Sequence, residues 1–275
     1  MSEATAWPAS RRITISDLQA ATDRGEHWSM LTSYDTLTAG IFEQAGVRAL
    51  LVGDTSAEMV LGYETTVPVT LDHLIPMVQA VVRGTRTALV VADLPFGSYQ
   101  AGPQAALARA VRQLKEGGAH AVKCEGGRRV LPQVRALTAA GIPVMGHLGL
   151  TPQSVHALGG VRRVQGRGDA GETLLADARA LQDAGAFAVV LESVPADLAR
   201  RVTAALRVPT IGIGAGPHCD AQILVWQDMA GLTAGRLPRF VKQYASLRDT
   251  LLEAARGYAG DVAAGRYPDP AHSYT

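Results

Sequence analysis

Eight strand-like runs recur along this 275-residue chain, and stretches with helical periodicity separate most of them. Most of the runs are short and apolar, which is typical of strands buried on both faces of a parallel sheet. They lie at 27–35, 49–54, 88–93, 120–125, 143–149, 188–192, 209–216 and 222–228. This alternation predicts an α/β fold, a (β/α)₈ TIM barrel. An open doubly wound sheet is the alternative, because a pattern of strands does not prove that the sheet closes.

The expected helices lie between the strands and after the last one. Several end on glycine, as a helix C-cap does. The helical stretches are 38–46, 71–84, 103–118, 130–141, 170–185, 195–206 and a final amphipathic one at 237–262. No linker-like stretch divides the middle of the chain. We therefore expect one domain over residues 1–275, with loose tails at about 1–11 and 263–275.

Composition excludes several classes of protein. Hydrophobic residues make up 47% of the chain and charged ones 19%, as in a globular protein with a large core. The net charge of +1 argues against a nucleic-acid partner. No apolar run is long enough to span a membrane, and the N-terminal segment lacks the pattern of a secretory signal. Two cysteines are too few for a disulfide framework, and we expect Cys124 to be a small core residue. A cytoplasmic protein fits these features.

Four of the strand-like runs end on a carboxylate. The four acids are Asp54, Asp93, Glu125 and Glu192. In (β/α)₈ barrels the active site forms where the strands end and the loops to the helices begin, so closure would bring the four acids to one rim. The alternative is that each acid caps the helix or turn that follows it.

Several carboxylates with few histidines or cysteines nearby suit a hard divalent cation, and Mg²⁺ is the expected ion. A 2-oxo acid would chelate such an ion, which would then stabilise an enolate as a Lewis acid, while one acid remains free for proton transfer. Lys123 lies on the same strand face as Glu125, where it either binds a substrate anion or pairs with an acid. His147 lies at the end of the fifth run. It either supports the site or is a hydrogen-bonded core residue. The hydroxyl of Thr55 either contacts substrate or makes a turn.

A series of motifs runs along the chain from about residue 12 to residue 260, in the order LTSYD, LVGD, LGYETTVPVTLD, VVADLPFGSY, HAVKCEGG, GHLGLTPQS, VQGRG, VVLESVP, PTIGIGAG and QILVWQD. With these motifs the sequence resembles the ketopantoate hydroxymethyltransferase family. The resemblance implies a barrel of the phosphoenolpyruvate mutase/isocitrate lyase type that assembles as a homodecamer.

The resemblance also implies a role for each site residue. Mg²⁺ would be bound at Asp54, Asp93 and Glu125, and the oxo acid at Asp54, Thr55, Asp93 and Lys123. Glu192 would be the general base. The implied reaction, a step of pantothenate biosynthesis, transfers a hydroxymethyl group from 5,10-methylenetetrahydrofolate to 3-methyl-2-oxobutanoate and gives 2-dehydropantoate through a metal-stabilised enolate. His147 is a candidate for the folate side.

Thr55, Glu58 and Cys124 are among the residues that depart from the family pattern. Thr55 and Glu58 stand in GDTSAEM, where the family has GDS followed by small residues, and Cys124 replaces a leucine. Thr55 adds a methyl group beside the expected oxo acid, and Glu58 places a further acid near the site or else faces solvent. Two alternatives therefore stay open. One is a paralogue that acts on another 2-oxo acid in a secondary pathway, and the other is a folate-independent C–C lyase of the same barrel superfamily.

Overall fold

Eight parallel strands form a closed barrel in the order of the sequence, and β8 pairs with β1. The computed structural model describes residues 7–8, 10–160 and 164–274. The strands are β1 (Trp28–Thr32), β2 (Ala49–Val52), β3 (Leu89–Asp93), β4 (Ala121–Glu125), β5 (Val144–Gly149), β6 (Ala188–Glu192), β7 (Thr210–Ile213) and β8 (Ala221–Leu224). The predicted barrel is confirmed, and the open sheet is excluded.

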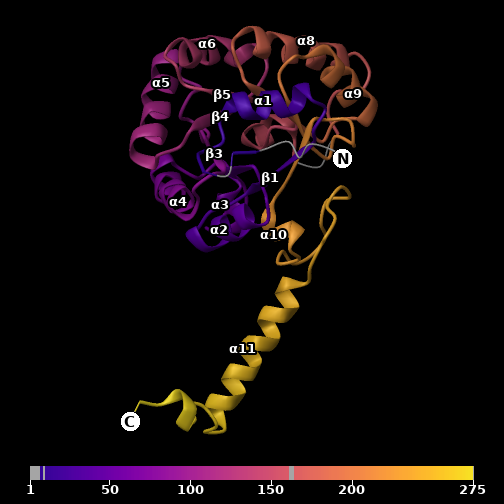
Figure 1. Ribbon diagram of the computed structural model, residues 1–275. Helices are drawn as coiled ribbons and strands as arrows, with labels where there is room; N and C mark the ends of the chain where they lie inside the picture. The colour runs from indigo at the N-terminus through magenta and orange to yellow at the C-terminus, as the bar shows by residue number, and fades with distance from the viewer. Residues whose placement is uncertain (1–6, 9, 161–163, 275) are drawn as a thin grey trace, which may run out of the picture. The chain divides into compact units, whose positions relative to one another are not determined.

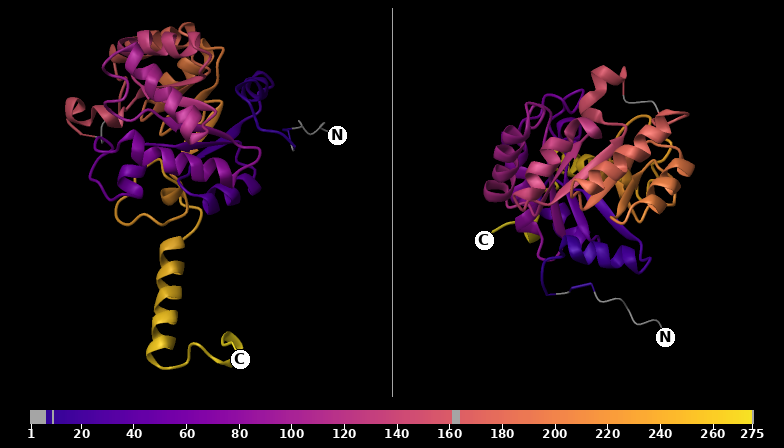
Figure 2. Two further views of the ribbon diagram at one scale, coloured as in Figure 1. Left: turned by 90° about the vertical axis from the view of Figure 1, so that its left-hand side faces the viewer. Right: turned by 90° about the horizontal axis from the view of Figure 1, so that it is seen from above.

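Helices surround the strands (Figures 1 and 2). In the part of the chain up to β8 they are α1 (Ile15–Asp23), α2 (Thr36–Gln44), α3 (Ser56–Met59), α4 (Leu71–Gly84), α5 (Pro103–Arg112), α6 (Leu131–Ala139), α7 (Val155–Leu158), α8 (Ala170–Asp183) and α9 (Ala196–Ala205). Short 3₁₀ turns precede two of them, η2 (Arg128–Val130) and η3 (Pro152–Ser154). The helix expected at 103–118 passes after α5 into a π-helical segment, η1 (Gln113–Gly117).

The chain divides into two compact units, residues 1–224 and 225–275. The first contains the whole barrel. The second contains α10 (Trp226–Met229), α11 (Leu247–Ala263) and the turn η4 (Pro270–His272), and α11 buries none of its residues. The helix expected at 237–262 begins only at Leu247, because a turn closed by the Val241 N–H and the Pro238 carbonyl comes first.

Two further expectations stay predictions. These are the single domain and the loose tails at 1–11 and 263–275, of which residues 1–6, 9 and 275 lie outside the described ones. No described helix is long and apolar enough to cross a membrane.

The side chains of each strand alternate between two apolar layers, as the period of two requires. On β4, Val122 and Cys124 point outward and pack with residues of the surrounding helices in one cluster. Cys124 is thus a buried core residue, as predicted. Ala121 belongs instead to a second cluster, which fills the inside of the barrel, and Lys123 and Glu125 follow it on the same face. The polar residues of β4 therefore point into the barrel.

The N-terminal end of the barrel interior is filled with apolar side chains. Every strand contributes, with Met30, Ala49, Leu51, Leu89, Val91, Ala121, Met145, Ala188, Val190, Ile211, Ala221 and Ile223. Helix α1 lies across this end (Figure 1), where Leu18 and Ala21 pack on the same cluster with Ile13 from the segment before the helix. The interior is therefore closed at the N-terminal ends of the strands, and polar side chains reach it only at the C-terminal ends.

Candidate active site

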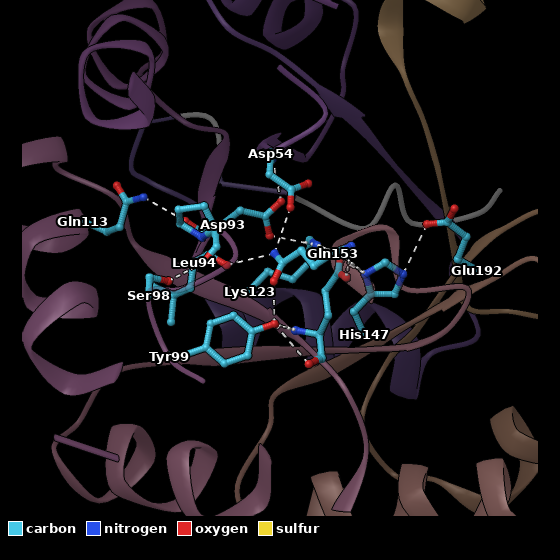
Figure 3. A network of polar contacts seen from close by, with 12 residues as sticks. Asp54, Asp93, Leu94, Ser98, Tyr99, Gln113, Lys123, His147, Gln153 and Glu192 are labelled. Carbon is cyan, nitrogen blue, oxygen red and sulfur yellow. Dashed lines mark hydrogen bonds and ion pairs between the residues drawn. The ribbon is translucent and has the colours of Figure 1, made fainter. Parts of the chain in front are cut away.

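The pairing register of the strands brings the charged residues together. Asp93 lies opposite Lys123 in the β3–β4 ladder, and Glu125 lies opposite His147 in the β4–β5 ladder. Asp54 lies two residues beyond β2, and its backbone N–H donates to Asp93 Oδ2 over 2.9 Å. Residues far apart in the sequence thus meet at one rim (Figure 3). The predicted convergence of Asp54, Asp93, Lys123 and Glu125 is observed.

None of the four acids caps the helix that follows it. The N-caps of the next helical elements are Thr55 for α3, Gly102 for α5, Gly127 for η2 and Pro195 for α9. The alternative that these acids cap the following helices is therefore wrong for this rim.

Lys123 is the centre of the cluster. Its Nζ lies 2.8 Å from Asp93 Oδ1 and 3.7 Å from Glu125 Oε1, and its side chain is 4% exposed. Burial by itself would lower the pKa of Lys123, but the charges of Asp93 and Glu125 outweigh it and raise the pKa above its usual value. The lysine is therefore a fixed cation in a nearly dry site.

Asp54 is placed where a negative charge is unfavourable. Burial, and then the nearby charges of Asp93 and Glu125, raise its pKa well above the usual value. Of its contacts, Lys123 and a hydrogen bond from Gln153 act in the opposite direction. The ionised form of Asp54 therefore needs a further positive charge at this position.

His147 connects the cluster to Glu192. Its Nδ1 lies 3.2 Å from Glu125 Oε1, and its Nε2 lies 3.2 Å from Glu192 Oε2. Burial and the charge of Lys123 lower the pKa of His147, but Glu125 and Glu192 outweigh them and the pKa rises to about 9. The imidazolium is therefore favoured at neutral pH, and its Nε2 faces the Glu192 side chain. Figure 3 shows Glu192 on the far side of His147 from Lys123.

The remaining predicted residues lie at the edge of this cluster. Thr55 is half-buried directly after Asp54, and its side chain makes no capping hydrogen bond with α3. Glu58 is exposed, so of its two expected positions the solvent-facing one is observed. Glu192 has a side chain that is 17% exposed, against 1% for Asp93. It is therefore the most accessible of the four acids.

Two uncharged residues of the site were not predicted. The Gln153 side chain donates to Asp54 Oδ2 over 2.8 Å, and the Tyr99 hydroxyl donates to Gln153 Oε1 over 2.7 Å. Both residues lie in loops and carry neither a charge nor a periodic pattern. Their inclusion in the motifs LPFGSY and GHLGLTPQS was the only available signal.

A hollow of about 440 Å³ adjoins the cluster on the side of Glu125 and Gln153. Its other lining residues include Phe96, whose side chain is 47% exposed, and the exposed Arg129. The hollow thus offers an aromatic surface and a cation beside the buried carboxylates.

The charges of the site leave room for a divalent cation. Four carboxylates (Asp54, Asp93, Glu125 and Glu192) face two cations (Lys123 and His147), which leaves a formal charge of −2 when all are ionised. Among the described residues, no three or more of His, Cys, Asp and Glu already converge on a point for a metal ion. Mg²⁺ needs only one or two protein carboxylates, because water and substrate oxygens complete its shell. The donor set therefore fits Mg²⁺ with a partly open coordination shell.

A closed (β/α)₈ barrel with buried charges at the C-terminal ends of its strands belongs to the TIM-barrel class of enzymes. The family model described as ketopantoate hydroxymethyltransferase matches residues 12–270. The chain belongs to this family of hydroxymethyltransferases.

Curated relatives are similar over nearly the whole chain. The 3-methyl-2-oxobutanoate hydroxymethyltransferase of Frankia casuarinae is 66% identical and aligns over 97% of this chain and 90% of its own. The protein of the same name from Leifsonia xyli subsp. xyli is 59% identical, with 99% of this chain and 98% of its own covered.

Solved structures share the fold at low sequence identity. Phosphonopyruvate hydrolase in complex with oxalate and Mg²⁺ has a TM-score of 0.62 at 16% identity, covering 96% of this chain and 93% of the other. The 2,3-dimethylmalate lyase, of the PEP mutase/isocitrate lyase superfamily, has a TM-score of 0.60 at 18% identity, covering 95% and 92%. The barrel is thus of the type that this superfamily contains, as the resemblance implied.

Proposed function

We propose that this chain transfers a hydroxymethyl group from 5,10-methylenetetrahydrofolate to 3-methyl-2-oxobutanoate, giving 2-dehydropantoate on the route to pantothenate. Membership of the family and the name of its curated relatives support the reaction. The observation that carries the proposal is the row of contacts from Asp93 through Lys123, Glu125 and His147 to Glu192, which supports an anion-binding role for Lys123 and a base role for Glu192.

Mg²⁺ is proposed to be held by Asp54, Asp93 and Glu125, which are buried at the same rim. When bound, the ion would supply Lewis-acid stabilisation to the oxo group of the substrate. Lys123 would bind the substrate carboxylate or the oxygen on which charge develops, together with Asp54, Thr55 and Asp93 around the oxo acid. The depth of Lys123 keeps its charge strong, because little water screens it there.

Glu192 is proposed to remove the proton from C3 of the oxo acid. A general base must be ionised and within reach of the substrate, and Glu192 is the most accessible of the four acids. His147 would position it through the 3.2 Å contact. The deprotonated carbon would then form a C–C bond with the one-carbon unit of the donor; water supplies the hydroxyl oxygen, and tetrahydrofolate leaves as its bond to that carbon breaks.

The hollow beside Glu125 is proposed to take part of the folate. Folates carry flat rings and a glutamate with carboxylates, and these complement the exposed ring of Phe96 and the guanidinium of Arg129. The Arg129 side chain is held by a hydrogen bond to Ser154 Oγ over 2.8 Å, so its charge stays at the mouth of the hollow.

We also propose that the chain acts as a homo-oligomer, a decamer by family resemblance, in the cytoplasm. Support for assembly comes from α11, which buries none of its residues although Leu251, Leu252, Tyr258 and Val262 are apolar and 44–62% exposed. A helix with exposed apolar side chains gains stability when a partner covers them.

The proposal is tested with a panel of 2-oxo acids, Mg²⁺ and 5,10-methylenetetrahydrofolate, with product followed by NMR. Turnover should be fastest with 3-methyl-2-oxobutanoate and should stop when EDTA removes the metal or when the folate is left out. Preference for another 2-oxo acid would identify a paralogue with a different substrate. C–C cleavage without folate would instead identify a lyase, the activity of a structural neighbour.

A further inference from the structure

The side chain of Gln153 joins the ends of three strands. Gln153 lies in η3 after β5 and is 4% exposed. Its Nε2 donates to Asp54 Oδ2 over 2.8 Å and to the Leu94 carbonyl over 3.0 Å. Asp54 follows β2 and Leu94 follows β3. The third strand is β4. Gln153 reaches it through Tyr99, whose hydroxyl hydrogen-bonds both Gln153 Oε1 and the Glu125 N–H.

The amide of Gln153 has a fixed orientation. The Leu94 carbonyl can only accept, so it requires the amide N–H₂ group, which the ionised Asp54 carboxylate requires as well. Its Oε1 then faces the Tyr99 hydroxyl, which can donate to it. A flip of the amide would place an oxygen against two other acceptors, so the hydrogen bonds allow one orientation only.

Tyr99 links this amide to the end of β4. Its hydroxyl accepts from the Glu125 N–H and lies 3.1 Å from the Glu125 carbonyl, while it donates to Gln153 Oε1. The ring is 1% exposed, and Gln133 Nε2 holds the Tyr99 carbonyl over 3.1 Å. Tyr99 therefore fixes Gln153 relative to the strand that carries Glu125.

Gln153 also acts on Glu125 directly. Its backbone N–H donates to Glu125 Oε2 over 3.1 Å, so one residue holds a carboxylate oxygen of Asp54 with its side chain and one of Glu125 with its backbone. Both donors are uncharged. They orient the two carboxylates without neutralising them, whereas a lysine or arginine at this position would compete with a metal ion for their charge.

We infer that Gln153, held by Tyr99, is a positioning residue that fixes the carboxylates of Asp54 and Glu125 for the metal ion and the oxo acid. This inference rests on the proposed function. Outer partners that orient metal ligands commonly contribute 10- to 100-fold to metal affinity, as an order of magnitude. The same size of effect is expected from Gln153, because two proposed ligands depend on it.

The test measures Mn²⁺ affinity by EPR on purified protein without oxo acid or folate. Gln153→Met keeps the length of the side chain and removes its side-chain hydrogen bonds to Asp54 and Leu94, so Mn²⁺ binding should weaken by about 10- to 100-fold. Tyr99→Phe removes only the hydroxyl and should weaken binding by a smaller factor. Gln182→Met is the control, because Gln182 is half-buried at the end of α8 and its side chain accepts from the Arg207 N–H ahead of β7, away from the cluster, so its affinity should equal that of the native protein.

Exchange of the C3 proton in D₂O, followed by NMR, provides a second reading. In Gln153→Met the exchange rate at saturating metal should still fall, because the misplaced carboxylates no longer align the oxo acid. Native Mn²⁺ affinity and exchange in both Gln153→Met and Tyr99→Phe would overturn the inference. If Gln153→Met does not fold, Tyr99→Phe decides alone. Absence of both Mn²⁺ binding and exchange in the native protein would instead contradict the proposed function.

Discussion

The two ends of the barrel interior are built by the same strands and have opposite chemistry. On β3, Leu89 and Val91 lie in the apolar cluster, and Asp93 follows at the next inward position. On β4 the corresponding step leads from Ala121 to Lys123. One two-residue step along a strand thus separates a hydrocarbon core from a cluster of charges.

Because of this difference, we expect the N-terminal end to contribute mainly to stability and the C-terminal end mainly to catalysis. Each large side chain at the N-terminal end contributes about 1.5–3 kcal/mol by leaving water. The buried charges at the other end cost free energy to desolvate, and their ion pairs offset only part of that cost. The apolar end therefore supports a polar end that is built for chemistry, and variants at the two ends should fail in different ways.

The largest effect is expected for Glu192→Gln at the polar end. Loss of the proposed general base should lower kcat by about 10²- to 10⁴-fold. The free energy of unfolding should change by less than about 1 kcal/mol, because the side chain is partly exposed. Steady-state kinetics, C3 proton exchange and urea unfolding measure these effects.

The control for this variant is Glu172→Gln, an exposed acid paired with Arg201, which should keep native kcat. Undiminished C3 exchange in Glu192→Gln would show that another group is the base.

Leu89→Ala at the apolar end should give the opposite result. Leu89 is 2% exposed, and its truncation should lower the free energy of unfolding by about 2–5 kcal/mol through a cavity. The kcat of the folded enzyme should stay native. Leu37→Ala is the control, since Leu37 is 78% exposed and its loss should change stability by less than about 0.5 kcal/mol. A large drop in kcat for Leu89→Ala would show that the apolar end also contributes to catalysis, which contradicts the proposed division of roles.

Low pH should destabilise the apolar end of the barrel, because His120 becomes protonated there. Burial, and then the charge of Arg12, lower the pKa of His120 from 6.5 to about 4, and its Nδ1 accepts from the Val90 N–H. The unfolded chain binds this proton first, so the stability present above pH 6.5 is lost as the pH falls toward 4. The loss should be about 2 kcal/mol, because solvent screens part of the effect on this incompletely buried ring.

Urea unfolding at several pH values measures this slope. His120→Gln should flatten it between pH 6.5 and 4, and an unchanged slope in that variant would assign the acid sensitivity to other groups.

Arg129→Ala should have the smallest effect. Loss of one exposed cation at the hollow should raise the KM for the folate about 3- to 5-fold, in line with about 0.5–1 kcal/mol for an exposed ion pair. The KM for the oxo acid should not change. The neighbouring Arg128, paired with Asp177, supplies the control Arg128→Ala. Equal KM values for the folate in the two variants would show that the hollow does not bind the folate.

The sequence predicted those features that depend on periodicity or on charge. Apolar runs of strand length identified all eight strands, and strand-end acids identified three carboxylates that meet beside Lys123. Gln153 was missed because 99 residues separate it from its partner Asp54, and only loop geometry brings the two together. The late start of α11 at Leu247 was missed because the apolar pattern continues through the turn at Pro238.

The apolar cluster under α1 also sets the route that molecules take. Leu18 and Ala21 cover the N-terminal end, so in the part of the chain that the structure describes Lys123 is approached from the opposite rim. If the oxo acid binds at Lys123 as proposed, it must enter before the larger donor lies over it, and the product must leave by the same way. An interior closed at one end thus predicts ordered addition, with the oxo acid first.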